Sequence, residues 1–243
     1  MKMTQEMRGL CGADSSYRRG LLIGLFAAVL TLIGDLLLGA VSLNGAEANR
    51  YRLLEYALRI PESRILAGGL LGVVGIAAEC IGFYQIYLLI RRKSPRLSTL
   101  FRAGMLCYLA WGCCGVHLNC SVLMFLFKRI SALNEEAALV IASDFQYHFL
   151  LPVYLLFMLG FMLMNLSQFI AFFQRKTPYP RYAAFFNIFI GILCSSLFVL
   201  LPGSSAFENG MLTSEISIGN LWMFLMLLLC CPKESEGREK SVH

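Results

Sequence analysis

Six long apolar runs constrain this chain more than any other feature of its sequence. A helix needs roughly 20 apolar residues to cross a hydrocarbon core about 30 Å thick. The runs are Gly20–Leu43, Ile65–Ile90, Ala103–Phe127, Phe149–Phe173, Tyr182–Leu201 and, shortest, Ile216–Cys231. Only 15% of the 243 residues are charged, whereas a soluble domain carries about 25%. We therefore expect an all-α polytopic membrane helix bundle with six transmembrane helices, and we exclude a disordered or nucleic-acid-coating protein.

The basic residues predict the orientation of these helices, because cytoplasmic loops carry an excess of Lys and Arg. With the N-terminus inside, 15 of the 21 Lys and Arg residues fall on the cytoplasmic side, and eight of the 15 acidic residues fall outside. The N- and C-termini are then both cytoplasmic. We expect a multi-pass protein of the plasma (inner) membrane, with the lipid bilayer as its main partner and no nucleic acid partner.

The predicted organisation has three parts. A cytoplasmic N-terminal segment covers residues 1–19, the transmembrane domain covers 20–231, and a cytoplasmic tail covers 232–243. The first run resembles a signal peptide because Ala46-Glu47-Ala48 is a small-x-small site, but it is longer than a signal sequence and contains Asp35. We interpret it as a retained helix.

Both long outer loops are predicted to contain short interfacial helices. In Ala46–Ile60, apolar residues recur near helical spacing until Pro61 ends the pattern. Asn134, followed by two glutamates, is typical of an N-cap and predicts a helix through Ala137–Phe145. Either helix could cap a site from outside or simply anchor the loop in the interface.

Polar side chains inside the apolar runs are the candidates for function. An ionisable residue at membrane depth costs about 2.5–3.5 kcal/mol, so such residues normally face the bundle interior or a cavity. The candidate solute-binding residues, which converge at mid-to-outer depth, are Asp35, Glu79, His117, Asn119, His148 and Asn220, with Asp144 beside His148. Either an outward-opening polar cavity or a sealed hydrogen-bonded core would accommodate them.

The two intramembrane carboxyl groups leave two interpretations open. Asp35 and Glu79 could exchange protons, as groups in proton-coupled transport do. Alternatively, a carboxyl–histidine or carboxyl–amide contact could lock helices together, with His117 or an outer arginine such as Arg64 as partner.

A cysteine and histidine stripe is a weak candidate for a metal site. Cys113, His117 and Cys120 have i, i+4, i+7 spacing and share one helix face. They could help to bind zinc, copper or a haem iron, with Glu79 or His148 completing the ligands, or they could simply pack between helices. The nine cysteines do not form a secreted disulfide framework, because most of them lie inside the runs.

Small and amide residues add packing signals. Gly68-x-x-x-Gly72 allows close helix approach, within the chain or in a homo-oligomer. Asn165, Gln168 and Asn187 lie in the inner third and could form an inner gate or bond helix to helix.

Several short phrases resemble an uncharacterised family of bacterial membrane proteins, a domain of unknown function. They are Gly34–Gly39, Gly72–Glu79, Cys114–His117, Pro178-Tyr179-Pro180 and Ser217–Phe224. The resemblance spans roughly residues 20–231 and implies a six-helix bacterial inner-membrane protein. It implies no activity, substrate or catalytic residue.

Three functional hypotheses follow. The leading one is binding or translocation of a small solute or protons, with Asp35, Glu79 and His117 as central groups. The second is an intramembrane metal or haem protein, which could be an oxidoreductase, and the third is a non-catalytic membrane scaffold. Because the chain has no phosphate-binding loop, His-Glu-x-x-His helix or Gly-x-Ser-x-Gly elbow, no catalytic residue is assigned.

Overall fold

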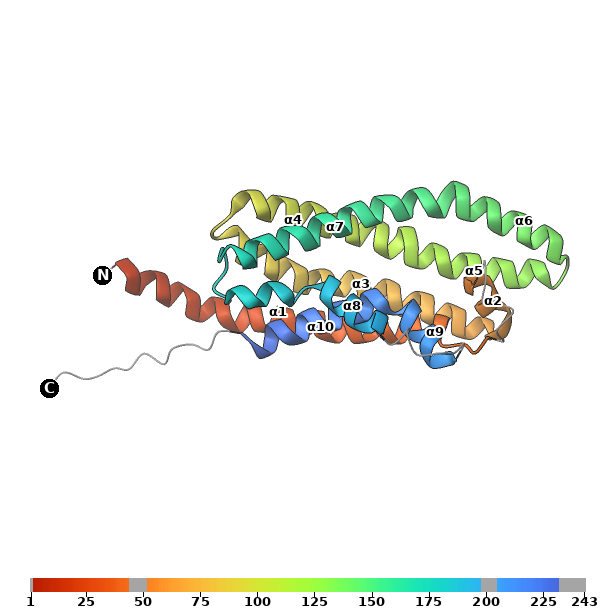
Figure 1. Cartoon of the computed structure of the whole chain (residues 1–243), viewed down its shortest axis with the longest axis horizontal. Coiled ribbons are helices and arrows are strands. Elements are labelled where there is room, and N and C mark those ends of the chain that lie inside the picture. Colours follow the sequence, from red (N-terminus) through yellow and green to blue (C-terminus); the bar gives the residue numbers. More distant parts are fainter. Residues whose placement is uncertain (1, 44–51, 198–204, 232–243) are drawn as a thin grey trace.

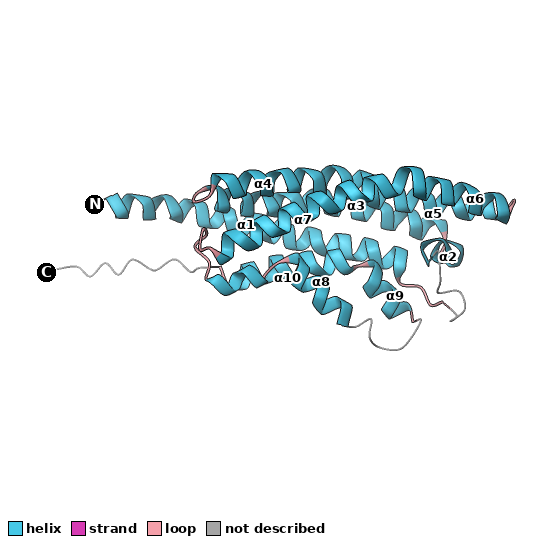
Figure 2. Ribbon diagram, turned by 45° about the horizontal axis from the view of Figure 1, so that its top comes forward, coloured by secondary structure: helices cyan, strands magenta, loops and turns pink. Residues whose placement is uncertain are grey.

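The computed structural model describes residues 2–43, 52–197 and 205–231, and these residues form helices with no strand among them. Figures 1 and 2 show the long helices lying side by side in an elongated bundle, with α2 and α9 at the end opposite the start of α1. The elements are α1 (Lys2–Gly39), α2 (Arg52–Arg59), α3 (Glu62–Arg91), α4 (Pro95–Cys107), η1 (Tyr108–His117), α5 (Leu118–Ser131), α6 (Glu135–Phe145), η2 (Gln146–Leu150), α7 (Leu151–Phe173), η3 (Arg181–Phe185), α8 (Ile188–Ser196), α9 (Ala206–Thr213) and α10 (Glu215–Leu229). The all-α prediction is confirmed for the described part of the chain.

Four helices in this part are long and apolar enough to cross a membrane. Two are residues Ser15–Gly39 of α1 and the whole of α3. The other two are continuous through π-helical segments: α4, η1 and α5 form Pro95–Ser131, and α6, η2 and α7 form Glu135–Phe173. Helices α9 and α10 bend by 68° and count as a fifth if they form one broken span. The described residues thus account for four or five of the six predicted spans.

The fifth predicted run differs most from expectation. It opens with the 3₁₀ helix η3 and then breaks before α8, which has nine residues. The break occurs because Asn187 is an N-cap: its Oδ1 accepts a hydrogen bond from the Phe189 N–H at 3.1 Å. The end of the predicted run, from residue 198, lies outside the described residues.

Both predicted loop segments are helical, but only α2 is a separate short helix, because α6 continues through η2 into α7. Helix α2 ends just before Pro61, and the first part of that loop lies outside the described residues. Its Leu54, Tyr56 and Ala57 are buried in a cluster with residues of α1, α3, α5 and α6, so α2 packs on the bundle. Asn134 caps α6 as predicted, accepting a hydrogen bond from the Ala137 N–H at 3.0 Å.

Glycines bring α1 and α3 into close contact. A Cβ added at Gly34 would lie 2.9 Å from both the Gly68 carbonyl oxygen and the Gly72 nitrogen. The small-residue motif of α3 therefore serves packing within the chain, as close-approach glycines do in membrane helices.

Arg64 holds the end of α1. Its guanidinium donates hydrogen bonds to the carbonyl oxygens of Leu37 at 2.5 Å, Ala40 at 2.8 Å and Leu36 at 3.1 Å. Carbonyls at a helix C-terminus have no partner within the helix, and a cation there is stabilising. Arg64 thus binds backbone carbonyls. The sequence had offered it instead as a partner for Asp35 or Glu79.

The opposite end of the bundle is fastened through the Thr177–Pro180 loop. The Tyr179 hydroxyl donates to the Leu227 carbonyl at 2.8 Å and lies 3.2 Å from the Tyr17 hydroxyl. Burial raises the pKa of Tyr179 well above its ordinary value, so this hydroxyl keeps its proton and continues to donate.

Candidate functional site

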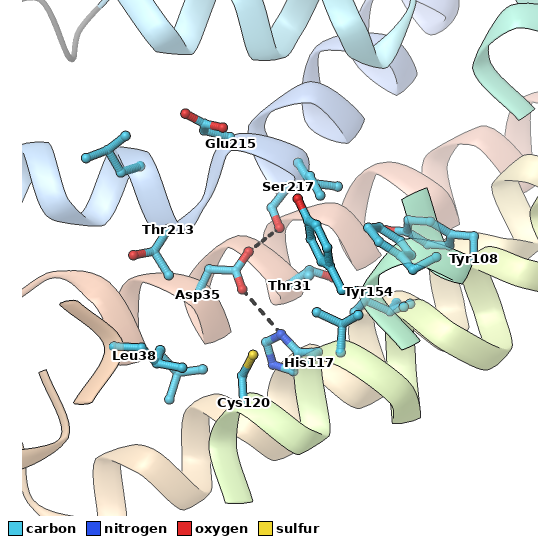
Figure 3. Close-up of a pocket in the computed structure, with 17 residues that line it drawn as sticks. Thr31, Asp35, Leu38, Tyr108, His117, Cys120, Tyr154, Thr213, Glu215 and Ser217 are labelled. Carbon is cyan, nitrogen blue, oxygen red and sulfur yellow. Dashed lines mark hydrogen bonds and ion pairs between the residues drawn. The ribbon is translucent and has the colours of Figure 1, made fainter. Parts of the chain in front are cut away.

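Asp35, in the last turns of α1, is the centre of a polar cluster at the α2 end of the bundle. It accepts a hydrogen bond from the Ser217 hydroxyl of α10, and its Oδ1 lies 3.4 Å from Nδ1 of His117 (Figure 3). On the other side of the imidazole, Nε2 of His117 lies 3.2 Å from the Gly68 carbonyl oxygen of α3. Both ring nitrogens therefore face acceptors, an arrangement that suits the doubly protonated, cationic imidazole.

Gly72 makes room for this imidazole. A Cβ at Gly72 would collide with Nε2 and Cε1 of His117. The same glycine that lets α1 approach α3 therefore also provides the seat for His117.

The π-helix η1 orients two of the site residues. Tyr108 and His117 stand nine positions apart, which in a regular α-helix of 3.6 residues per turn places them on opposite faces. A π-helix has about 4.4 residues per turn, so nine positions complete roughly two turns and both residues share one face. The widened helix thus turns Tyr108 and His117 toward the same interior.

Glu79 forms a second, sealed cluster. Its side chain is 0% exposed, and one carboxyl oxygen lies 2.5 Å from the Tyr108 hydroxyl and 2.8 Å from Nδ2 of Asn220. The other lies 2.9 Å from the Thr31 hydroxyl, and Nδ2 of Asn220 also donates to the Tyr108 oxygen at 2.8 Å. Helices α1, α3, η1 and α10 therefore meet at one carboxyl group.

The donors and acceptors around Thr31 indicate how Glu79 can be buried in its uncharged, protonated form. The Thr31 hydroxyl has one proton but lies within reach of two acceptors, Glu79 Oε1 and the Ala27 carbonyl at 3.1 Å. If Glu79 carries a proton on Oε1, it donates to Thr31, and Thr31 donates to Ala27. Tyr108 and Asn220 then donate to the other Glu79 oxygen, and no net charge is buried.

A cavity of about 230 Å³ adjoins the Asp35 cluster. Its polar lining comes from Thr31, Asp35, Tyr108, His117, Cys120, Tyr154, Thr213, Glu215 and Ser217. Its apolar lining includes Ile76, Val116, Phe157 and Ile216. Among the described residues that line it there is no Lys or Arg. Glu79 is behind the wall: Thr31 and Tyr108 touch both the cavity and Glu79.

Four of the six candidate residues lie in these two linked clusters, namely Asp35, Glu79, His117 and Asn220. Asn119 does not join them, because its Nδ2 donates to the Gly115 carbonyl of its own helix at 2.7 Å. His148 is exposed on η2 with its ring against Tyr147, and Asp144 is exposed as well.

The cysteine and histidine stripe is divided between two environments. His117 and Cys120 line the cavity, whereas the Cys113 thiol faces the Val73 carbonyl at 3.4 Å. Within the described ranges, no group of three or more His, Cys, Asp or Glu residues is arranged to hold a metal ion. Seven cysteines whose side chains the structure describes are free thiols, namely Cys80, Cys107, Cys113, Cys114, Cys120, Cys194 and Cys230.

The inner amide residues bond helix to helix. Nδ2 of Asn187 donates to the Asn165 carbonyl at 3.1 Å, and Nε2 of Gln168 donates to the Phe186 carbonyl at 3.2 Å. Of the two interpretations offered by the sequence, these contacts favour helix attachment.

The sequence interpretation missed Thr31, Tyr108, Ser217 and Tyr154. Thr31 precedes Asp35 by four residues and Ser217 precedes Asn220 by three, so helical spacing could have found both. Tyr108 had no such signal, because regular spacing sets it opposite His117.

Comparison with known proteins places the chain in a family but not in a functional class. No curated protein and no solved structure matches it. The family model described as "Family of unknown function (DUF6796)" matches residues 3–234. The chain therefore belongs to this family of unknown function, in agreement with the resemblance found from the sequence.

Proposed function

We propose that this protein is a bacterial inner-membrane protein whose outer-half cavity binds a small solute and exchanges protons through Asp35 and His117. The observation that carries the proposal is the Asp35–His117 pair on the wall of a cavity between apolar helices. A charged pair at membrane depth is costly unless it is used or fully sealed, and this pair borders open space.

The proposed topology has six passes with residues 1–19 and 232–243 in the cytoplasm. Three long helices already follow α1 as alternating passes, and η3 and α9 lie at opposite ends of the bundle (Figure 1). Helix α8 lies along the bundle between these two ends. Helix α3 ends at Arg91, and α7 ends two residues before Arg175. Figure 1 shows both helix ends on the side of the bundle where α10 ends, as expected for a cytoplasmic side that carries basic residues.

The two carboxyl groups have different roles in this proposal. Asp35 holds the solute or the proton, because it faces the cavity. Glu79 locks four helices together and positions the cavity residues Thr31 and Tyr108, because its contacts are complete and it is fully buried. Of the two carboxyl groups, Glu79 is thus the one with a purely structural role. A homo-oligomer stays a separate prediction.

Solute-driven proton movement in liposomes tests the proposal. Purified protein is reconstituted around a pH-sensitive dye, and small cationic, anionic and neutral solutes are added outside in separate trials. We expect one class to change the internal pH with the wild type but not with Asp35→Asn. His148→Gln is the matched control, since His148 is exposed and outside the site, and it should behave as wild type. If no class moves protons faster than in protein-free liposomes, the proposal fails.

A further inference from the structure

The lining of the cavity selects a class of ligand. Asp35 supplies a carboxylate, and the hydroxyls of Ser217, Thr213 and Tyr154 add potential acceptors. No Lys or Arg belongs to the described lining, so His117 is the only lining residue there that could offset the charge of an anionic ligand. An anion would also be repelled by the Asp35 carboxylate, so the lining disfavours anionic ligands. Arg64, which the sequence offered as a partner for the carboxylates, donates its hydrogen bonds to the Leu37 and Ala40 carbonyls at the end of α1.

The apolar part of the lining is aromatic on the side formed by η1 and α7. The Phe157 ring centroid lies 6.0 Å from that of Tyr108 and 6.4 Å from that of Tyr154. All three residues line the cavity. Aromatic faces attract cations and also bury apolar groups, so this wall suits a compact molecule with an ammonium group and one apolar substituent. The volume of about 230 Å³ lies below the usual range for drug-sized ligands, which favours a small ligand.

We propose that the solute is a small organic amine, and that its ammonium group binds Asp35 in exchange for the proton on Nδ1 of His117. This inference rests on the proposed function and specifies its solute.

The exchange is balanced in charge. In the proposed state before binding, His117 carries a proton on both ring nitrogens and pairs with the Asp35 carboxylate, whose Oδ1 lies 3.4 Å from Nδ1. When the ammonium arrives, Nδ1 of His117 releases its proton to water on the cavity side, and the ammonium takes over the carboxylate. The neutral imidazole keeps its seat, because Nε2–H still donates to the Gly68 carbonyl. The freed Nδ1 lone pair can then accept a hydrogen bond from the ammonium.

The other titratable groups near His117 do not replace Asp35 in this exchange. Glu79 lies behind the wall and is satisfied by Thr31, Tyr108 and Asn220. Glu215 lines the cavity, but Figure 3 shows its carboxylate turned away from Asp35. Cys120 and Tyr154 also line the cavity but carry no charge in their ordinary protonation states at neutral pH.

Calorimetry of the full-length protein in detergent, with three matched probes, tests the proposal. The probes are phenethylamine, 2-phenylethanol and phenylacetate, which share a phenyl group and differ in charge. We expect the amine to bind about tenfold or more tightly than the alcohol, as a charge-assisted hydrogen bond provides, and the acid to bind most weakly. Repeating the titration in buffers of different ionisation enthalpy should show about one proton released per amine bound, so affinity rises by up to about tenfold per pH unit.

Two variants and a control locate the exchange. Asp35→Asn should abolish the preference for amine while keeping the weak binding of 2-phenylethanol, which shows that the cavity is still folded. His117→Gln should bind the amine without proton release. His148→Gln, at an exposed histidine outside the cavity lining, should behave as wild type.

Three results would overturn the proposal: equal binding of amine and alcohol, no proton release with the wild type, or no binding of any probe. Preferred binding of the neutral or acidic probe through Asp35 and His117 would overturn the amine assignment but leave the proposed function standing. Proton movement driven by a non-amine solute in the liposome assay would do the same.

Discussion

Asp35 and Glu79 lie on the neighbouring apolar helices α1 and α3 but in opposite kinds of surroundings. Asp35 is 8% exposed and borders a cavity, and its Oδ1 lies 3.4 Å from Nδ1 of His117. Glu79 is 0% exposed and contacts Thr31, Tyr108 and Asn220. The difference teaches that an acid in an apolar helix is not by itself a functional residue. In the proposed function, the cavity and the adjacent His117 distinguish the binding residue Asp35 from Glu79, which attaches helices to one another.

The largest effect on stability is expected at Glu79, where helices α1, α3, η1 and α10 meet. Glu79→Ala removes the acceptor of Tyr108 and Asn220 and leaves both donors buried, at a cost of about 3 kcal/mol or more. Glu79→Gln should cost much less, because an amide can donate to Thr31 and accept from the other two, as the protonated acid does. Thermal unfolding in detergent measures both. If Glu79→Gln is as unstable as Glu79→Ala, the neutral network is wrong.

A smaller effect is expected where the site meets the helix packing. Gly72→Ala places a methyl group on the His117 imidazole, so we expect roughly 1–3 kcal/mol of destabilisation and loss of the Asp35–His117 contact. Gly210→Ala is the milder comparison, since its added Cβ would lie 3.0 Å from the flexible end of Leu36 and 3.2 Å from the Cβ of Ala40, away from His117. Unfolding and solute-driven proton movement are measured on both variants. A Gly72→Ala protein with wild-type proton movement would contradict the seat assigned to His117.

The end of α1 should respond more weakly still. Arg64→Met keeps the apolar stem but loses three hydrogen bonds to backbone carbonyls, and we expect about 1–2 kcal/mol of destabilisation. Arg129→Met is the comparison, because Arg129 is exposed and its 2.6 Å pair with Glu62 should contribute under about 1 kcal/mol. Equal effects in an unfolding experiment would show that Arg64 does not cap α1.

The smallest effects are expected at the candidates that the structure separates from the site. His148→Gln and Asn119→Ala should each change stability by about 0.5 kcal/mol or less. Neither should alter solute-driven proton movement in liposomes. Loss of that movement in His148→Gln would extend the site to η2 and contradict the separation of His148 from Asp35 and His117.

Much of this arrangement could be predicted from the sequence, for identifiable reasons. Apolar runs of about 20 residues predicted the long helices, and the intramembrane polar residues Asp35, Glu79, His117 and Asn220 had to seek one another in an apolar environment. The Asn134 cap followed from local chemistry. Depth alone was not sufficient for Asn119 and His148, since depth does not specify the direction in which a side chain points.

The remaining features depend on geometry that regular spacing does not encode. The π-helix brings Tyr108 onto the face of His117, and no residue pattern announced it. The break at Asn187 interrupts an apolar run because a side chain prefers a cap and a contact with α7 to a continuous helix. The cavity itself results from which side chains fill the space between α1, α7 and α10, and this is a tertiary property.

One measurement most directly tests the proposed division between Asp35 as the binding residue and Glu79 as a structural residue. It compares solute-driven proton movement in liposomes for Asp35→Asn and Glu79→Gln side by side. We predict that Asp35→Asn abolishes the movement and that Glu79→Gln retains it, with both proteins folded by thermal unfolding. Retained movement in Asp35→Asn, or its loss in a folded Glu79→Gln protein, would contradict the account.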